Sequence, residues 1–386
     1  MNPVSPPIWL MAMAAFTVGC GMRILDPLLP MLAGEFGVGL GAVAPLIGGF
    51  ALAYGLGQLA AGPLGDALGK MRVAAVAMAI YAATLLGATL AGDLFSLLLM
   101  RIASGLAAAA TIPLFMAHIG DRVPYEHRQG TIGRFLTGMV MATLLAGPIS
   151  GTVAEFAGWR SSFLVLGGMG AAIALLFMLL LGPVWKEGGR GGSGGLGGFI
   201  RLFGRPAGRR LMIAATADGM LLFGGAIPFI ASLLITRFGL SAATAGLIVA
   251  GFGIGAFVYT RAAPWLVRKL GERGLVLWGG VGLTAALVAM ALAPVWWVVA
   301  AAQVVFGLHF FMLHGVLQAR ATEALPEARG TAVAGFAMSL FLGQSLGAVV
   351  FGALIAAAGF TAGFLVAAAG TVALTFAIRA KVIPKA

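Results

Sequence analysis

The feature that most constrains this chain is a series of long apolar segments separated by short polar loops. A helix needs about 20 consecutive apolar residues to cross a bilayer, and twelve segments approach or exceed this length. They are residues 9–33, 42–64, 72–92, 94–118, 131–154, 160–184, 211–236, 242–264, 274–293, 295–319, 330–356 and 360–380. Because most of the loops are very short, consecutive helices must run antiparallel. The pattern predicts an all-α membrane protein with twelve transmembrane helices.

The composition argues against a soluble fold and against nucleic-acid binding. Hydrophobic residues make up 61% of the 386, and only 9% are charged, whereas soluble domains carry about a quarter charged residues. The net charge of +12 comes from basic residues in short loops, which is typical of cytoplasmic loops and not of a nucleic-acid surface. The 60 glycines are expected at close helix contacts, where small residues are favoured in membranes.

The basic residues predict the orientation of the chain. All but four of the 24 Lys and Arg residues fall on one side of the predicted helices; the exceptions are Arg23, Arg101, Arg160 and Arg237. Because cytoplasmic loops carry the excess of Lys and Arg, both termini are expected in the cytoplasm. We predict a multi-pass protein of a bacterial inner membrane, acting as a monomer and surrounded by membrane lipid.

A glycine-rich, basic segment divides the chain. Residues 185–210 lack the Gly-Lys-Ser/Thr end of a phosphate-binding loop, so we interpret them as a flexible cytoplasmic linker with a short surface helix attracted to anionic lipid. The predicted domains are therefore a six-helix bundle at 1–184, the linker at 185–210 and a second bundle at 211–386.

The two predicted bundles resemble each other in sequence. Arg101, Gly105, Asp121 and Pro124 recur as Gln303, Gly307, Glu323 and Pro326 at a constant offset, and residues 36–38 recur as residues 238–240. Two parallel repeats of this kind predict pseudo-symmetric six-helix bundles.

The loop after the second predicted helix contains Gly62, Leu64, Asp66, Gly69, Lys70 and Arg72 in the pattern G-x-L-x-D-x-x-G-[RK]-x-[RK]. This pattern resembles the signature of the major facilitator superfamily. In the fifth helix Gly147, Pro148 and Gly151 resemble the motif of the drug:proton antiporter branch, although Thr152 stands at the position of its last glycine. The resemblance implies alternating access, with Asp66 holding the cytoplasmic side closed and Arg72 as its partner. The alternative is a simple salt bridge in the loop.

Ionisable residues inside a bilayer are costly and need a reason to be there. Arg23 and Asp26 lie three residues apart, on one face of the first helix, and Arg101 of the fourth helix is expected at a similar depth. We predict that Asp26 carries the coupled proton and that Arg101 controls its protonation. The alternative is a static ion pair that only fixes helix packing. Asp218 is interpreted as a second protonation site or a cation-recognition site, or else as a residue in contact with cavity water.

The remaining candidates are polar residues that a substrate could meet. They are Gln58, His309, His314 and Gln344, which join Arg23, Asp26, Arg101 and Asp218 as predicted substrate contacts. His309 and His314 are five residues apart and so point in different directions, and no Cys/His cluster is present. We therefore predict no metal and no cofactor.

Three functional hypotheses follow from these residues. The first is proton-coupled export of a small, partly apolar compound, which would make this a non-enzymatic transporter. The second is uptake or exchange of a small organic anion bound by Arg23 and Arg101, since arginine matches the geometry of a carboxylate. The third, a membrane enzyme or lipid scramblase, lacks a recognisable set of catalytic residues.

Overall fold

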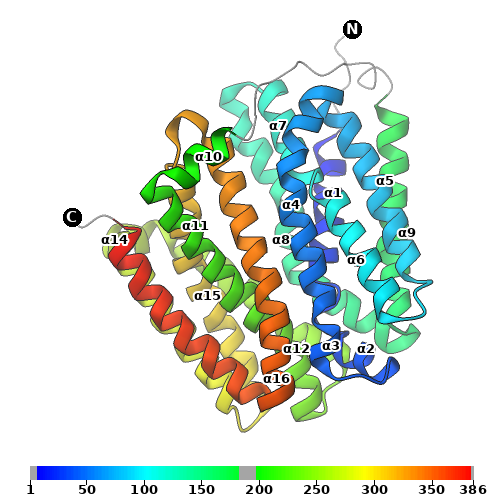
Figure 1. Ribbon diagram of the computed structural model, residues 1–386, viewed down its shortest axis with the longest axis vertical. Helices are drawn as coiled ribbons and strands as arrows, with labels where there is room; N and C mark the ends of the chain where they lie inside the picture. Colours follow the sequence, from blue (N-terminus) through cyan, green and yellow to red (C-terminus); the bar gives the residue numbers. More distant parts are fainter. Residues whose placement is uncertain (1–6, 182–196, 384–386) are drawn as a thin grey trace.

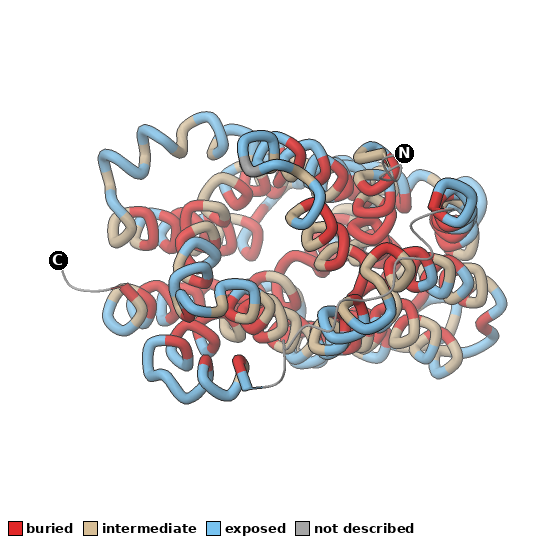
Figure 2. The backbone as a smooth tube through the Cα atoms, turned by 90° about the horizontal axis from the view of Figure 1, so that it is seen from above, coloured by how far each residue is buried: buried red, intermediate tan, exposed pale blue. Residues whose placement is uncertain are grey.

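A computed structural model describes residues 7–181 and 197–383, and within these ranges the chain is helical and forms no strand. Figure 1 shows the helices in two groups, with the first half of the chain on the right and the second half on the left. Seen from above, the buried residues gather within the two groups and the exposed residues line the outside (Figure 2). This burial pattern suits a protein whose outer surface meets lipid.

The described part of the first half contains nine helical segments. They are α1 (Ile8–Arg23), α2 (Leu29–Glu35), α3 (Leu40–Val43), α4 (Pro45–Leu68), α5 (Lys70–Ala88), α6 (Leu94–Ala108), α7 (Thr111–Arg122), α8 (Tyr125–Ala157) and α9 (Trp159–Leu180). The start of α6 is capped by Asp93, whose side chain accepts a hydrogen bond from the Ser96 amide at 2.7 Å, a common signal for a helix start. This hydrogen bond lowers the pKa of the Asp93 carboxyl.

The second half begins with a short helix and contains the two longest segments. Its elements are α10 (Gly197–Gly204), α11 (Pro206–Asp218), the π-helix η2 (Gly219–Ala226), α12 (Ile227–Phe238), α13 (Ala242–Val249), α14 (Gly251–Leu292), α15 (Trp296–Ala321), the 3₁₀-helix η3 (Pro326–Ala328) and α16 (Arg329–Lys381). The predicted linker falls partly on residues 182–196, outside the described residues. Its remainder forms α10 and the start of α11.

The described residues make twelve crossings, as predicted. Nine helices of residues 7–181 and 197–383 are long and apolar enough to span a membrane. Two of them turn back on themselves, at Gly271 (φ 59°) in α14 and at Gly359 (φ 80°) in α16, where a left-handed backbone favours glycine. Each therefore makes two crossings, and the interrupted α1–α2 segment supplies the remaining one.

The same three helix pairings occur in both halves, which supports the predicted repeat. In the first half α1 packs on α8, α4 on α6, and α5 on α9. In the second half α11 and η2 pack on the first part of α16, where Gly219 meets Leu340, α14 packs on α15, and the later parts of α14 and α16 pack together, where Gly280 meets Thr375. The equivalent residues Arg101 and Gln303 are both 1% exposed. The fold is thus a pair of pseudo-symmetric six-helix bundles.

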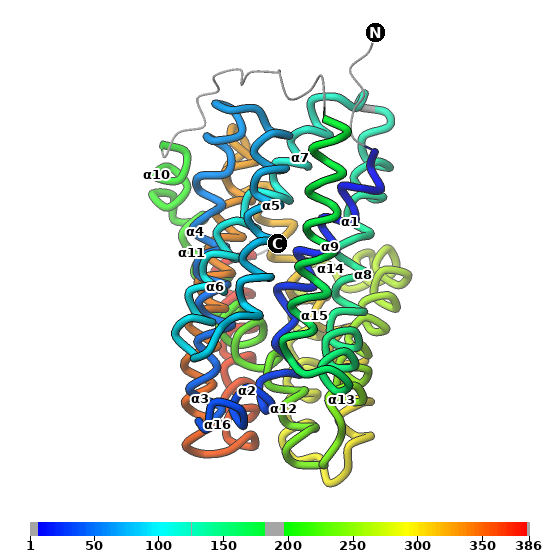
Figure 3. Tube along the Cα trace, turned by 90° about the vertical axis from the view of Figure 1, so that its right-hand side faces the viewer, coloured from blue at the N-terminus to red at the C-terminus, as the bar shows by residue number. Residues whose placement is uncertain are grey.

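We call the end of the molecule that carries Lys70, Arg122, Arg205 and Arg320 the basic end, and the opposite end the far end. The basic end is at the top of Figure 1, and Figure 3 shows the same helices from the side. At the far end, Glu35 accepts a hydrogen bond from the Trp159 indole at 2.5 Å and pairs with Arg160. Chiefly because of Arg160, the pKa of Glu35 lies below its ordinary value.

The halves meet along two seams in which glycines allow backbones to touch. In the seam between α4 and α16, a Cβ placed on Gly48 would lie 3.0 Å from the Ser345 carbonyl oxygen. In the seam between α8 and α13, a Cβ on Gly151 would lie 2.3 Å from the Ala242 carbonyl oxygen. Glu155 also accepts a hydrogen bond from the Ala243 amide at 3.1 Å, so it caps a helix of the other half.

Both seams end before the basic end. A Cβ placed on Gly62 of α4, or on Gly130 or Gly133 of α8, would meet no described atom within 4 Å apart from the backbone of its own helix. The two bundles are therefore closed against each other at the far end and separated at the basic end.

Gly151→Ala is expected to open the seam at the far end, because the new methyl group would overlap the Ala242 carbonyl. Overpacking of this kind costs about 1–3 kcal/mol. Spin labels on the far-end loops of the two halves should report a longer distance, with a lower Tm in detergent. Gly133→Ala, on the same helix but facing open space, serves as the control. Equal behaviour of the two variants would contradict the close contact.

Candidate functional site

The first membrane crossing is broken beside its two charged residues. Helix α1 ends at Arg23, residues 24–28 form turns, and α2 begins at Leu29. The Asp26 amide donates to the Arg23 carbonyl at 3.1 Å, and the side chains lie 3.5 Å apart, from Arg23 Nη1 to Asp26 Oδ2. Pro27 and Pro30 account for the break, because proline does not continue a helix.

Arg101 lies beside this pair without forming an ion pair to it. It is 1% exposed; Nη1 donates to the Gly21 carbonyl at 3.0 Å, and Nε donates to the Leu46 carbonyl at 3.3 Å. Its guanidinium lies 4.3 Å from the centre of the Phe50 ring. Arg101 thus joins α1, α4 and α6, and the direct ionic partner of Asp26 is Arg23.

A second buried carboxylate in the other half has a partner that the sequence analysis missed. Asp218, the last residue of α11, is fully buried, and its Oδ2 accepts a hydrogen bond from His314 Nδ1 of α15 at 2.7 Å. The two residues are 96 positions apart, so no local pattern reveals the contact. Their only sequence signal is that both are ionisable residues within apolar segments, where such residues need partners.

The helix changes its winding immediately after Asp218. Residues of η2 form a π-helix, a rare conformation that often occurs at functional sites. Gly219 and Gly224 lie so close to α16 that an added Cβ would come within 2.0 Å of the Leu340 carbonyl oxygen and 2.1 Å of the Gln344 carbonyl oxygen, respectively. Glycine is therefore needed here for close packing, and Gln344 belongs to this helix contact.

The two acidic residues are connected through a row of side chains across the halves. The Arg23 guanidinium lies 5.7 Å from the centre of the Phe223 ring in η2. Phe223 contacts the His314 ring at 5.4 Å between centroids. Since His314 bonds Asp218, the row runs from Asp26 through Arg23, Phe223 and His314 to Asp218. We call these five residues the central row.

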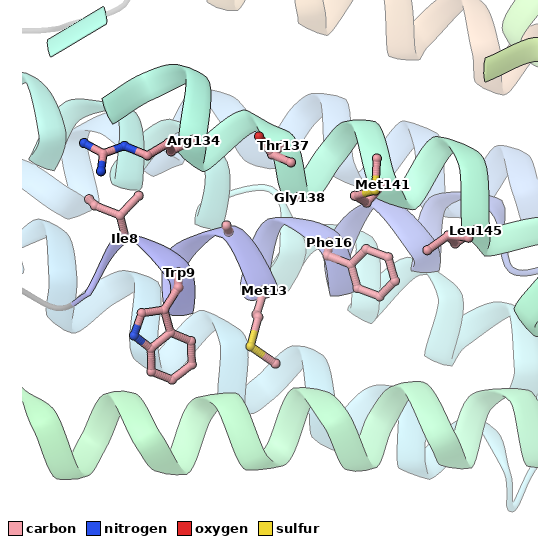
Figure 4. A pocket seen from close by; sticks show the side chains of 10 residues that line it. Ile8, Trp9, Met13, Phe16, Arg134, Thr137, Gly138, Met141 and Leu145 are labelled. Carbon is pink, nitrogen blue, oxygen red and sulfur yellow. The ribbon is translucent and has the colours of Figure 1, made fainter. Parts of the chain in front are cut away.

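A cavity of about 740 Å³ lies along α1 and α8. Figure 4 shows the side chains that line this cavity, with Arg134 near one end of the cavity and Leu145 at the other. It is lined by Ile8, Trp9, Ala12, Met13, Phe16, Arg134, Thr137, Gly138, Met141 and Leu145. Trp9, Phe16 and Arg23 recur every seven residues and share one face of α1. Because Arg23 on this face meets Phe223, the apolar cavity lies on the side of α1 that faces the second half.

Other predicted residues lie away from the central row. The Gln58 side chain bonds the Tyr54 hydroxyl, and the Tyr54 ring meets Phe341 of the second half at 4.6 Å. His309 Nδ1 contacts the Val305 carbonyl at 2.8 Å, and its ring packs on Gly282. Of the predicted substrate contacts, the structure brings together Arg23, Asp26, Asp218 and His314, with Arg101 beside them.

The predicted gating motif lies at the basic end. Gly69 has φ 97°, which permits the abrupt turn from α4 into α5, and Lys70 pairs with Asp121 of α7 at 2.5 Å. The Arg72 side chain also interacts with another group of the protein. The motif of the fifth helix lies in the seam between halves, where Gly147 packs on Gly246 and Gly151 on Ala242.

Within the described ranges, no group of His, Cys, Asp and Glu is arranged to hold a metal ion. Of the two acidic residues of the site, Asp26 pairs with Arg23 and Asp218 pairs with His314. Each buried carboxylate of the site is thus paired with a basic side chain, and an apolar cavity lies along the face of α1 that carries Arg23.

Comparison with known proteins shows the family. The family model of the Major Facilitator Superfamily matches residues 11–224 and 211–385, so this chain belongs to that superfamily. It is 26% identical over 366 residues to an uncharacterised MFS-type transporter, YwfA, of Bacillus subtilis, covering 94% of this chain and 88% of the relative. It is 26% identical to a probable sugar efflux transporter of Helicobacter pylori, over 72% of this chain and 69% of that protein.

Solved structures show the same fold. A bacterial homologue of the human lysosomal transporter Spinster, in an inward-facing and unoccupied conformation, superposes with a TM-score of 0.77. The two sequences are 18% identical, and the match covers 99% of this chain and 100% of that one. Its membership of the superfamily makes the protein a multi-pass membrane transporter with a small-molecule substrate, and the solved structures show the same fold.

The contact between Asp218 and His314 predicts thermodynamic coupling. Asp218→Asn and His314→Phe should each lower Tm in detergent, because either change disturbs a buried hydrogen bond. The double variant should lose less than the sum of the two, since contacting residues are not additive. As a control, Asp218→Asn combined with His309→Phe should be additive. Additivity in both pairs would contradict the contact.

Proposed function

We propose that this protein is a secondary active transporter that couples proton movement to export of a small, partly apolar compound by alternating access. The observation that carries the proposal is the central row, which places a carboxylate of each half at the two ends of one connected set of side chains. The broken first crossing and the π-helix support it, since transporters of this kind build their sites from discontinuous helices.

The proposed proton carrier is Asp26. Its side chain is 4% exposed and that of Arg23 is 20% exposed, so the pair is nearly dry but reachable from the cavity side. When the halves move and the Arg23–Phe223 contact changes, the charge balance at Asp26 changes with it. The positive charge of Arg101, which lies beside this pair, would favour release of the proton. Each proton that enters down a 100 mV potential supplies about 2.3 kcal/mol.

The proposed orientation places the basic end in the cytoplasm, in agreement with the positive-inside rule. With both termini cytoplasmic and the protein in a bacterial inner membrane, the arrangement described here is open inward. The residues of the gating motif, Asp66, Lys70 and Arg72, then lie at the cytoplasmic end, which must close when the transporter opens to the opposite side of the membrane.

We retain the division into bundles at 1–184 and 211–386, joined by the segment 185–210, as part of this proposal, and we propose that the protein acts as a monomer.

Export of a compound with apolar surface is favoured by the cavity, which is lined almost entirely by apolar side chains. Met13 and Met141 line it, and methionine side chains adapt to varied apolar shapes. The likeness to a protein named as a sugar efflux transporter agrees with the proposed direction. Membership of the drug:proton antiporter branch rests on the Gly147-Pro148 motif.

A second candidate function is the uptake or exchange of a small organic anion. Arg23 favours it, because its guanidinium is the more exposed member of its ion pair and faces the second half. Arg101 is less suited to bind an anion directly, since Nη1 and Nε already donate to backbone carbonyls. Arg23→Gln should abolish binding of an anionic ligand and weaken that of a neutral one much less.

Asp26→Asn should abolish proton-driven transport and leave passive exchange intact. A thermal-shift screen of metabolites and drugs at two pH values would identify a ligand, because binding raises the apparent stability. The radiolabelled ligand is then followed in liposomes, with and without a pH gradient. We expect gradient-driven transport to be lost while counterflow is retained. Asp93→Asn, which keeps a helix cap outside the site, is the control. Unchanged gradient-driven transport in Asp26→Asn would refute the role of Asp26.

A further inference from the structure

The short helix α10 lies across the basic end beside the start of α16 (Figure 1). Leu202 is its fully buried residue, and a Cβ placed on Gly335 of α16 would lie 2.5 Å from the Leu202 side chain. A Cβ on Gly198 would lie 2.9 Å from Thr331. Just after α10, Arg205 binds Glu327 through two hydrogen bonds, at 2.6 and 3.2 Å. One face of α10 is therefore docked on α16.

The other face of α10 is apolar and basic. The Ile200 side chain is 73% exposed and that of Phe203 36% exposed. Arg201 of α10 is exposed as well, and so are Arg209 and Arg210 near the start of α11, the helix that follows and packs on α10. Exposed apolar side chains among arginines, at the end of a transmembrane bundle, match the interface of a bilayer, where the apolar groups enter the headgroup region and the arginines meet anionic headgroups. Charge complementarity thus favours anionic phospholipid as the partner.

The docked face of α10 covers a residue at which the seam between α4 and α16 would continue if the basic end closed. On the first half, glycines recur every seven residues at Gly41, Gly48, Gly55 and Gly62. The first three pack on the second half at Gly352, Ser345 and Met338, respectively. These partners are also seven apart, and the next residue in their series is Thr331. Continuing the seam towards the basic end would therefore bring Gly62 to Thr331, which is the residue that Gly198 covers.

We propose that α10 is a lipid-bound latch: anionic phospholipid holds it at the membrane surface, where it covers Thr331 and keeps the basic end open. Closing the basic end requires α10 to leave Thr331, and lipid bound at Ile200, Phe203 and the arginines opposes this movement. The proposal goes beyond the proposed function, because it depends on closure of the basic end and not on the identity of substrate or coupling ion.

The experiment uses the full chain in nanodiscs of phosphatidylcholine, with and without phosphatidylglycerol. Native mass spectrometry measures retained phosphatidylglycerol, and spin labels at Gln129→Cys and Thr322→Cys, in a Cys20→Ser background, measure the opening of the basic end. The test variant is Arg209→Gln/Arg210→Gln. The control is Arg261→Gln/Arg268→Gln, which removes two exposed arginines of the same half away from α10.

We expect phosphatidylglycerol to increase the population with the long label distance in the unmodified protein and in the control. In Arg209→Gln/Arg210→Gln, retention should fall on the order of tenfold, and the effect of lipid on the distance should disappear. Equal losses in both variants, or no effect of phosphatidylglycerol on either measurement, would overturn the proposal. Retention without any change in distance would also overturn it, because α10 would then bind lipid without acting as a latch.

Discussion

A charge inside a bilayer must be paired or hydrogen-bonded where it stands, and this requirement organises the centre of the molecule. Arg101 meets it by donating to two backbone carbonyls, which ties three helices of the first half together. Asp26 meets it through Arg23, and Asp218 through His314. Because Arg23 also lies over Phe223 of the second half, a change in the distance between the halves must alter the surroundings of Asp26. Charge pairing and movement of the halves are therefore linked in one set of contacts.

The seams determine which movements are available to the two bundles. Glycines of α4 and α8 let the halves touch through their backbones at the far end, and Glu155 adds a hydrogen bond to the start of α13. The equivalent glycines near the basic end face open space. Small residues thus run the length of α4, although only part of their series is in contact. A helix that can extend its contact in either direction along such a series is suited to rocking.

The sequence predicted the fold because its strongest signals are local and repeated. Long apolar segments, the loop around Asp66 and the recurrence of Arg101 as Gln303 each follow from the residues alone, and the bend at Asp26 follows from Pro27 and Pro30. The contacts of the site depend on distant residues, so periodicity did not reveal them. The partner of Asp218 was not recognised because His314 lies on another helix, 96 positions away. The partners of Arg101 are backbone carbonyls, and because every residue has one, the sequence does not reveal which carbonyls are used. The roles of these residues in transport remain predictions.

The central claim is that Asp26 exchanges a proton while the basic end is open. Infrared spectroscopy of the purified protein during a pH titration tests it most directly, because a protonated carboxyl group has a carbonyl band that a carboxylate lacks. The account predicts a band that appears as the pH falls, is missing in Asp26→Asn, and shifts its midpoint when Arg23 is replaced by Gln. If the band is unchanged in Asp26→Asn, the exchanging proton lies elsewhere and the account is wrong.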